Sequence, residues 1–224
     1  TLSKKRDSLK RVAASGDKIA INQLATLELY YKHLESGQSA RDLVVENNDV
    51  IVELQLLTNK PVLYVCNVDE DSINGNHYTK LVTELVRSEN VKVLIISAAI
   101  EADINELETE SDKQEFFFDL GLNEPGVNKI IRSAYNLLGL QTFFTAGEKE
   151  VRAWTIKKGA LAPEAAGVIH TDFEKGFIKA EVISFQDRIL LKTEQACREA
   201  GKISIEGKGY QVVDGDVIHF RFNV

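Results

Sequence analysis

The stretch KPVLYVCNVDE, residues 60–70, constrains the fold of this chain more than any other. Pro61 to Cys66 is a short, nearly unbroken apolar run rich in β-branched residues. It predicts a strand buried on both faces of a parallel sheet, although so short a run leaves a buried helix segment open. Ligands of open α/β sheets bind beyond the carboxyl ends of strands. We therefore interpret Asn67 and Glu70, which follow this strand, as the edge of a nucleotide pocket.

The residues after the strand favour adenine over guanine. In the guanine-reading loops of GTPases, Asn-Lys-x-Asp follows such a strand, and its acid accepts protons from guanine N1 and N2. Here Val68 stands at the second position and the longer Glu70 at the fourth. Adenine lacks both of those protons, and a buried unpaired carboxylate is costly. The spacing alone leaves a plain strand-to-helix turn with an Asn cap open, because Asn-x-x-Glu also occurs at 105–108.

A second strand is expected at Val91 to Ile96, and it ends in Ser97 and Ala98. An amphipathic helical pattern at 78–86 separates the two strands, so a right-handed crossover would bring both strand tips to one sheet edge. Ser97 and the small Ala98 would let backbone N–H groups approach a base, as in the serine-alanine loop of GTPases. A small-residue turn into a helix is the alternative.

Three regions follow from the patterns along the chain. Residues 1–58 predict a basic helix and a second helix with coiled-coil spacing, broken at 15–17, then a short helix at 49–57. Residues 59–140 alternate helix and strand and end in a helix from Pro125. Its expected inward residues are Val127, Ile130, Ile131, Ala134, Tyr135 and Leu138. Residues 141–224 predict a small mixed sheet wrapped on one helix, the β-grasp layout, with strands at 142–145, 151–156, 177–184, 210–213 and 217–222.

Composition places the chain among soluble globular proteins. Of its 224 residues, 44% are hydrophobic and 27% charged, and no apolar run is long enough to span a bilayer. No signal peptide opens the chain, and two cysteines give no disulfide framework, which predicts a cytoplasmic protein. The sequence starts at Thr1 and contains no Met, so we expect a fragment of a longer protein.

Charge is distributed unevenly. The net charge of −7 arises in residues 59–140, where 14 acidic residues face 7 basic ones. A duplex-wide basic footprint is therefore excluded, and any contact with nucleic acid must be local. The basic first helix, with Lys4, Lys5 and Arg6, has two interpretations: a ribosome or RNA contact, or a solvated charged surface.

Catalytic and metal-binding patterns are missing from the sequence. The four histidines have no ligand spacing, His170 and Asp172 look like a turn cap, and Trp154 looks like core. Nothing resembles G-x-x-x-x-G-K-[ST], the segment that holds phosphates and magnesium in P-loop enzymes. The sequence therefore predicts recognition of a base, with no catalytic residue and no metal ligand, and leaves it uncertain whether this chain is an enzyme.

Two long runs carry a resemblance to a known family. QTFFTAGEKEVRAWTIKKGALAPEAAGVIHTDFEKGFIKAEVISF (141–185) and GKGYQVVDGDVIHFRFNV (207–224) closely resemble the C-terminal TGS domain of the YchF family of Obg-like P-loop ATPases. KPVLYVCNVDED and IISAAIEADINEL are similar to that family's base-recognition strand and serine-alanine loop. Residues 1–37 are similar to its coiled-coil insertion, so the resemblance covers essentially the whole chain.

The resemblance implies the C-terminal half of an α/β OBG-type G domain (59–140), with a coiled-coil arm (1–58) and a TGS domain (141–224). It implies that Asn67 contacts the purine of ATP, Val68 packs beside it, Glu70 disfavours guanine, and Ser97 with Ala98 completes the loop. The family commonly has Lys where Ala99 stands.

The resemblance also implies that the P-loop, the switch regions and the Mg²⁺ ligands precede Thr1. The arm and the TGS domain would bind RNA or the large subunit of the ribosome in regulating translation or stress responses. We expect a monomer without membrane contact. A nucleotide-independent adaptor, in which only the arm and the TGS domain act, is the alternative function.

Overall fold

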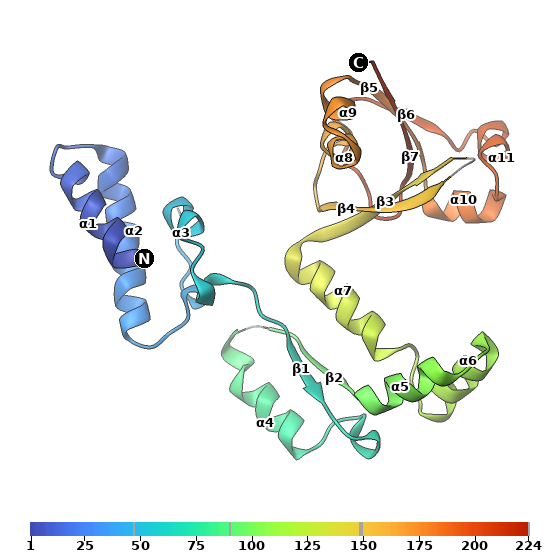
Figure 1. The fold of residues 1–224 in the computed structure, drawn as a ribbon, viewed down its shortest axis with the longest axis horizontal. Coiled ribbons are helices and arrows are strands. Elements are labelled where there is room, and N and C mark those ends of the chain that lie inside the picture. Colours follow the sequence, from blue (N-terminus) through green and yellow to red (C-terminus); the bar gives the residue numbers. More distant parts are fainter. Residues whose placement is uncertain (47, 90, 148–149, 224) are drawn as a thin grey trace. The chain divides into compact units, whose positions relative to one another are not determined.

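The structure is a computed structural model that describes residues 1–46, 48–89, 91–147 and 150–223. The chain forms two compact units, Thr1–Gly126 and Val127–Val224, each of which is considered by itself. Figure 1 shows their helices and strands in chain order.

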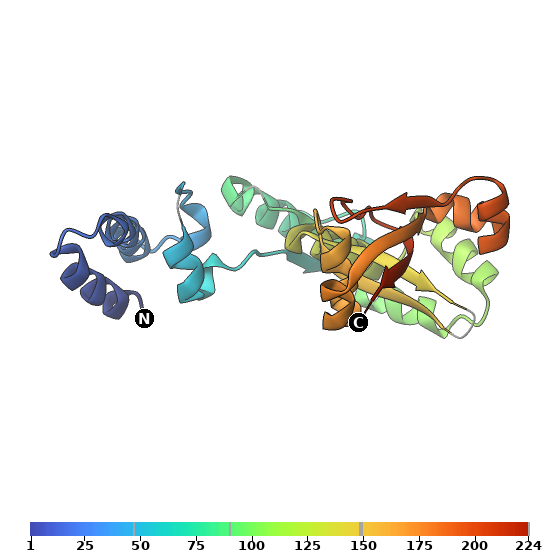
Figure 2. The same ribbon diagram turned by 90° about the horizontal axis from the view of Figure 1, so that it is seen from above.

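The first unit begins with a helical hairpin made of α1 (Leu2–Ala13) and α2 (Lys18–Glu35), drawn in blue in Figures 1 and 2. The predicted break at 15–17 is confirmed: Gly16 has a φ of 88°, and the Asp17 carboxylate caps α2 by accepting the amide protons of Ile19 and Ala20. Leu27 and Tyr30 are completely buried between these helices and α3 (Asp49–Leu54). Two 3₁₀ turns, η1 (Ala40–Asp42) and η2 (Leu57–Asn59), flank α3.

An α/β segment follows the hairpin. Strand β1 (Tyr64–Asn67) pairs in parallel with β2 (Val93–Ile96), and α4 (His77–Leu85) forms the crossover between them, flanked by η3 (Glu70–Ser72) and η4 (Arg87–Glu89). The prediction that the first strand is buried on both faces is wrong, because Val65 is 40% exposed and burial alternates along β1. In the described residues this sheet has two strands, and burial on both faces would require helices packed against each face.

Helices α5 (Ala98–Glu106) and α6 (Glu110–Asp119) follow in the first unit, and α7 (Gly126–Leu138) begins at its last residue. Three of the residues expected to face inward on α7 are instead about half exposed, namely Val127, Ile131 and Leu138. Periodicity identifies the face of a helix that can be buried, and it does not say whether a neighbour covers that face. The buried positions are Gly126 and Ser133, and the Gly126 amide donates to Glu101 of α5.

The second unit is a five-stranded mixed sheet. Its strands are β3 (Leu140–Ala146), β4 (Val151–Lys157), β5 (Phe177–Ile183), β6 (Ser204–Glu206) and β7 (Val217–Phe222). They lie in the order β4-β3-β7-β5-β6, and only β3 and β7 are parallel neighbours. Helix α7 belongs to this unit from Val127 onward. Four shorter helices follow in its described residues: α8 (Ala162–Ile169), α9 (Thr171–Lys175), α10 (Phe185–Leu191) and α11 (Glu194–Glu199).

The core of the second unit lies between one face of the sheet and α8 (Figure 1). Phe143 and Ile218 point from the sheet toward three alanines of α8, all of them fully or almost fully buried. Alternation along the strands turns Phe144, Glu181 and Val217 to the opposite face, where the Phe185 ring of α10 lies 6.0 Å from that of Phe144. We call this opposite side of the sheet the α10 face.

Some predicted elements of the second unit are wrong. Residues 210–213 form no strand, because the Tyr210 hydroxyl and the Val213 amide both donate to the Asp216 carboxylate and fold the segment into a turn. A single bridge, Leu161 to Gln211, remains of the expected pairing. The sequence analysis did not predict α9, α10 or β6, each of which has seven residues or fewer.

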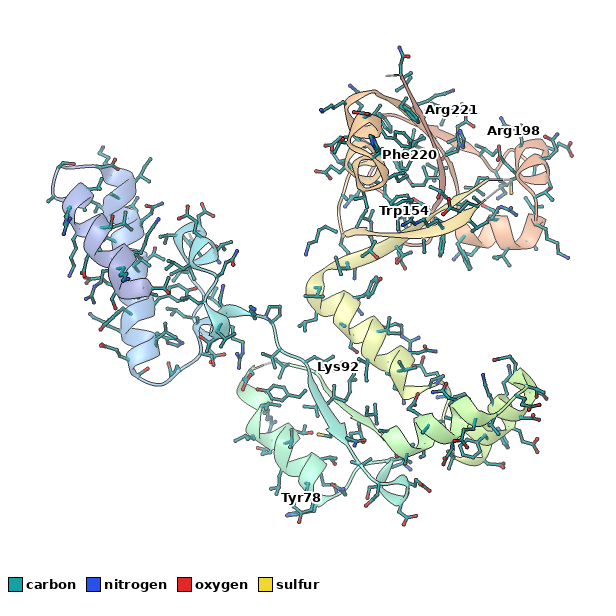
Figure 3. The ribbon with its side chains drawn as sticks, in the orientation of Figure 1. Tyr78, Lys92, Trp154, Arg198, Phe220 and Arg221 are labelled. Atoms are coloured by element: carbon teal, nitrogen blue, oxygen red, sulfur yellow. The ribbon has the colours of Figure 1, made fainter. Side chains whose placement is uncertain are left out.

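One acidic side chain on the α10 face is held by several cations. Glu181 is largely buried and accepts hydrogen bonds from Arg221 at 3.1 and 3.5 Å, with Arg198 at 3.6 Å and Lys179 at 3.9 Å. Arg198 of α11 and Arg221 of β7 are labelled in Figure 3. The hydrogen bond from Arg221, assisted by the charges of the three cations, holds the pKa of the Glu181 carboxyl below its ordinary value although burial opposes this shift.

This lowered pKa predicts a pH-dependent contribution to stability. It is fully present above the ordinary glutamate pKa of about 4.3 and is lost as pH falls through the lower pKa of the folded state. We expect Glu181→Gln to reduce the loss of unfolding free energy between pH 6 and pH 3, measured by urea unfolding with circular dichroism. Glu199→Gln, on the exposed surface of α11, is the control and should keep the wild-type slope; an equal slope in Glu181→Gln would contradict this role.

Candidate functional site

The loops that follow β1 and β2 begin side by side. The parallel register pairs Asn67 with Ile96, and the Val68 amide donates to the Ile96 carbonyl at 2.9 Å. The Asn67 side-chain oxygen accepts the Ala98 amide proton at 3.0 Å. The structure thus brings Asn67, Val68, Ser97 and Ala98 together at one edge of the sheet, and the Asn67 amide nitrogen is left as a hydrogen-bond donor.

Ser97 and Ala98 differ in what they can offer a ligand. The Ser97 hydroxyl is the cap of α5 and accepts the Ile100 amide proton at 3.5 Å, and the residue is 2% exposed. The Ser97 hydroxyl is therefore used to cap α5. The exposed Ala98 can offer a ligand its backbone and its small side chain. The turn interpretation and the loop interpretation of this segment are thus compatible.

Glu70 lies at the start of η3, and it is exposed. Its neighbours Asp69 and Asp71 are exposed as well, so three consecutive acids surround the tip of β1. This local negative charge repels phosphate groups, so the tip itself is unsuited to binding a phosphate.

A groove of 490 Å³ runs along β1 toward this tip. Asn67 and Val68 line its end, Cys66 and Tyr64 line its length, and α4 contributes the opposite wall through Thr79 and Val82. Glu70, Ser97 and Ala98 are not among its lining residues. The exposed Tyr78 of α4 borders the same groove and is labelled in Figure 3.

A feature that the sequence analysis missed fixes the wall of this groove. Asn76 caps α4 by accepting the Thr79 amide proton at 3.1 Å, while the Thr79 hydroxyl accepts the Asn76 amide proton at 2.8 Å. This reciprocal capping box is visible in the sequence as Asn-x-x-Thr before an apolar run, so it could have been found there.

The other residues considered in the sequence have structural contacts. Trp154 packs against the core of the second unit, and its indole N–H donates to the Thr145 hydroxyl at 2.9 Å. The His170 ring accepts the Asp172 amide proton at 3.2 Å at the start of α9. In the described ranges no group of three or more His, Cys, Asp or Glu could hold a metal ion.

The comparison with known proteins covers nearly all of this chain. The chain is 52% identical over 218 residues to the Ribosome-binding ATPase YchF of Escherichia coli O157:H7, which is 96% of this chain and 60% of that protein. It is 45% identical over 229 residues to the Ribosome-binding ATPase YchF of Bacillus subtilis, covering all of this chain and 62% of that protein. The chain belongs to the YchF family.

Two further matches agree with membership of the YchF family. Residues 140–223 match the family profile YchF-GTPase_C, described as a protein of unknown function (DUF933). The solved structure of the Schizosaccharomyces pombe YchF GTPase superposes with a TM-score of 0.85 at 36% identity, covering 98% of this chain and 61% of that one. The chain thus spans about 60% of the length of the YchF proteins that it matches.

Across the parts of this YchF-family chain that the structure describes, none of the helices combines the length and the hydropathy that crossing a lipid bilayer requires.

The bond between Asn67 and Ala98 predicts a measurable protection of one amide. We expect Asn67→Ala to speed hydrogen exchange at the Ala98 amide by about fivefold, since a hydrogen bond contributes about 1 kcal/mol. Asn67→Asp keeps an acceptor oxygen and should retain most of the protection, which NMR exchange on the 224-residue chain can measure. Asn74→Ala, in the nearby exposed loop, is the control. Unchanged exchange at the Ala98 amide in Asn67→Ala would contradict the hydrogen bond that joins the two loops.

Proposed function

We propose that this chain is the part of an Obg-like, ATP-hydrolysing YchF protein that selects the nucleotide base and contacts the ribosome or RNA in the cytoplasm. The observation that carries the proposal is the Asn67–Ala98 hydrogen bond, which holds two predicted base-reading loops at one sheet edge. The names of the bacterial relatives, ribosome-binding ATPases, agree with it. Regulation of translation or of stress responses is the role that we propose for the whole protein.

In this proposal the base lies against the tips of β1 and β2. The Asn67 amide nitrogen donates to a purine nitrogen, because the side-chain oxygen is already engaged with Ala98. Val68 packs beside the base, and the Ala98 backbone approaches it. Ser97 contributes by fixing the start of α5, since its own hydroxyl caps that helix.

Selection against guanine depends on Glu70. A longer acid beside an apolar Val68 is not placed as the Asp of a guanine-reading loop, so guanine N1 and N2 would lack their acceptor. The three acids at this tip also require that the phosphates lie elsewhere. Phosphate and Mg²⁺ binding in the whole protein would come from a P-loop segment, which supplies positioning and charge stabilisation for hydrolysis.

The domain scheme is part of the same proposal. Residues 1–58 would be a coiled-coil arm, residues 59–140 the C-terminal half of the G domain and residues 141–224 a β-grasp TGS domain. The hairpin of α1 and α2 supports the first assignment, and a mixed sheet packed on α8 supports the last. We propose that the protein acts as a monomer.

Some cations of the basic helix α1 are engaged in contacts within the protein, and others are exposed without an ion-pair partner in the described chain. Lys5 pairs with Glu53 at 2.9 Å, and the Arg6 guanidinium lies 4.1 Å from the centre of the Tyr31 ring. Lys4 and Arg11 are exposed, and within the described chain neither has an ion-pair partner. These two cations are therefore the ones that we assign to a ribosomal RNA contact.

Base selection can be tested in the full-length protein. Val68→Lys with Glu70→Asp rebuilds the guanine-reading pattern, and charge-assisted hydrogen bonds to guanine contribute about 1.5–3 kcal/mol. We expect the ratio of ATP to GTP affinity, measured by calorimetry, to fall by roughly tenfold or more. Val52→Lys with Glu84→Asp makes the same changes at exposed positions and should keep the wild-type ratio. A wild-type ratio in the first variant would mean that these residues do not read the base.

The arm contact can be tested by ribosome co-sedimentation of the full-length protein. We expect Lys4→Glu with Arg11→Glu to weaken pelleting at low salt, because both substitutions place acids against RNA phosphates. Lys80→Glu with Lys92→Glu, on the α/β segment, changes the net charge equally and is the control. Normal pelleting of the first variant would exclude these two cations from the interface. A full-length protein that pellets with ribosomes without binding ATP would instead support a nucleotide-independent adaptor.

A further inference from the structure

Two adjoining hollows lie on the α10 face of the second unit. The first, of 420 Å³, is lined by Glu181, Ile183 and His219 from the sheet and by the start of α11. The second, of 430 Å³, is lined by Phe144, Phe185 and Ile189. Arg188 and Lys192, from α10 and its C-terminal cap, line both hollows, as do three apolar residues of the sheet: Ala146, Val151 and Val217.

The shared cations have no neutralising partner. Among the residues that the structure describes, Arg188 and Lys192 take part in no ion pair or side-chain hydrogen bond. The two acids of the first hollow are already neutralised, Glu181 by Arg221, Lys179 and Arg198, and Glu194 by Arg198 at 3.0 Å. The boundary between the hollows therefore carries uncompensated positive charge in a chain whose net charge is −7.

The backbone at Lys192 is a second sign that its side chain is used. Lys192 has a φ of 65°, a left-handed conformation that favours glycine because it is unfavourable for any residue with a Cβ atom. A glycine would end α10 there without strain. A lysine at this position places a positive charge at the boundary of both hollows.

Each hollow also offers an aromatic or apolar surface. Phe185 is 44% exposed beside the half-buried Phe144, and Ile189 next to them is 61% exposed. The exposed His219, which pairs across the sheet with Glu181, lines the first hollow together with Ile183 and Val217. Cations flanked on both sides by such surfaces match a phosphate that lies between two unstacked bases.

We propose that the α10 face binds single-stranded RNA, with a backbone phosphate at Arg188 and Lys192 and the two adjacent bases in the two hollows. This inference rests on the proposed RNA-linked function and adds the surface and the form of RNA that it recognises. A duplex would offer only phosphates and leave both hollows empty, because its bases are stacked inside. An acidic peptide would satisfy the charges without using Phe185 or His219 as stacking surfaces.

Fluorescence anisotropy of the 224-residue chain with a labelled seven-nucleotide RNA tests the proposal. We expect Arg188→Glu with Lys192→Glu to weaken binding by at least about tenfold at low salt, and to lower the salt slope by about 0.7, since that is the contribution of the one single-strand phosphate that these two cations neutralise. Lys175→Glu with Lys208→Glu makes the same change of charge at exposed positions outside the hollows and should change affinity less than about twofold.

Phe185→Ala separates stacking from charge. It should weaken binding of the RNA while leaving the salt slope at the wild-type value. Circular dichroism checks that Phe185→Ala and the Arg188→Glu, Lys192→Glu variant remain folded. A blunt RNA duplex of equal length should bind more weakly than the single strand. Wild-type binding in Arg188→Glu with Lys192→Glu, equal binding of the duplex, or binding of a Glu- and Leu-rich peptide in place of RNA would overturn the proposal.

Ribosome co-sedimentation of the full-length protein distinguishes failure of this surface from failure of the proposed function. If the Arg188→Glu, Lys192→Glu protein fails to bind the short RNA and pellets less with ribosomes, both ideas hold. If it binds RNA normally and the full-length wild type pellets, only the assignment of this surface is wrong. If the full-length wild type does not pellet at all, the proposed ribosome function is wrong, and the oligonucleotide measurement still decides the RNA site.

Discussion

The parallel pairing of β1 with β2 is the constraint on which the candidate site depends. Only in this register do Asn67 and Ile96 lie side by side, so that one short amide side chain reaches the backbone of the next loop at Ala98. A shift by one residue would turn Asn67 to the other face of the sheet and separate the loops. The hydrogen bond therefore depends on the strands, and the mutual position of the loops depends on the hydrogen bond.

Charge divides the chain into regions suited to different partners. The segment around β1 and β2 carries the acidic surplus, and the tip of β1 presents three exposed acids, which suits contact with an uncharged base. Residues 141–224 contain 12 basic and 12 acidic residues, yet their ion pairs gather around Glu181 and, among the described residues, leave Arg188 and Lys192 uncompensated. A neutral sum thus conceals a local positive surface, which agrees with the expectation that any contact with nucleic acid must be local.

The sequence predicts well those elements whose residues determine their own conformation. The break before α2 follows from Gly16 and Asp17, and the strands that reach Asn67 and Ile96 follow from their apolar runs.

The sequence predicts less well those features that depend on residues far away in the chain. The exposure of Val65 and Ile131 depends on which elements cover them, and periodicity carries no information about that. The residues of segment 210–213 locally prefer extended backbone, which is why a strand was predicted there. The hydrogen bonds that Tyr210 and Val213 donate to Asp216 outweigh this preference and fold the segment into a turn. The proposed RNA surface joins α10, which was not predicted, to residues of β3, β4 and β7, so no single stretch of sequence contains it.

The position of Trp154 has a practical consequence for spectroscopy. It is the single tryptophan of the chain, its ring contacts the core of the second unit, and the Arg152 guanidinium lies 4.2 Å from the ring centre. Its emission therefore reports the environment of this unit alone, whereas far-ultraviolet dichroism averages over the whole polypeptide. Divergence of the two signals during denaturation would reveal that the units melt independently, without any label being attached.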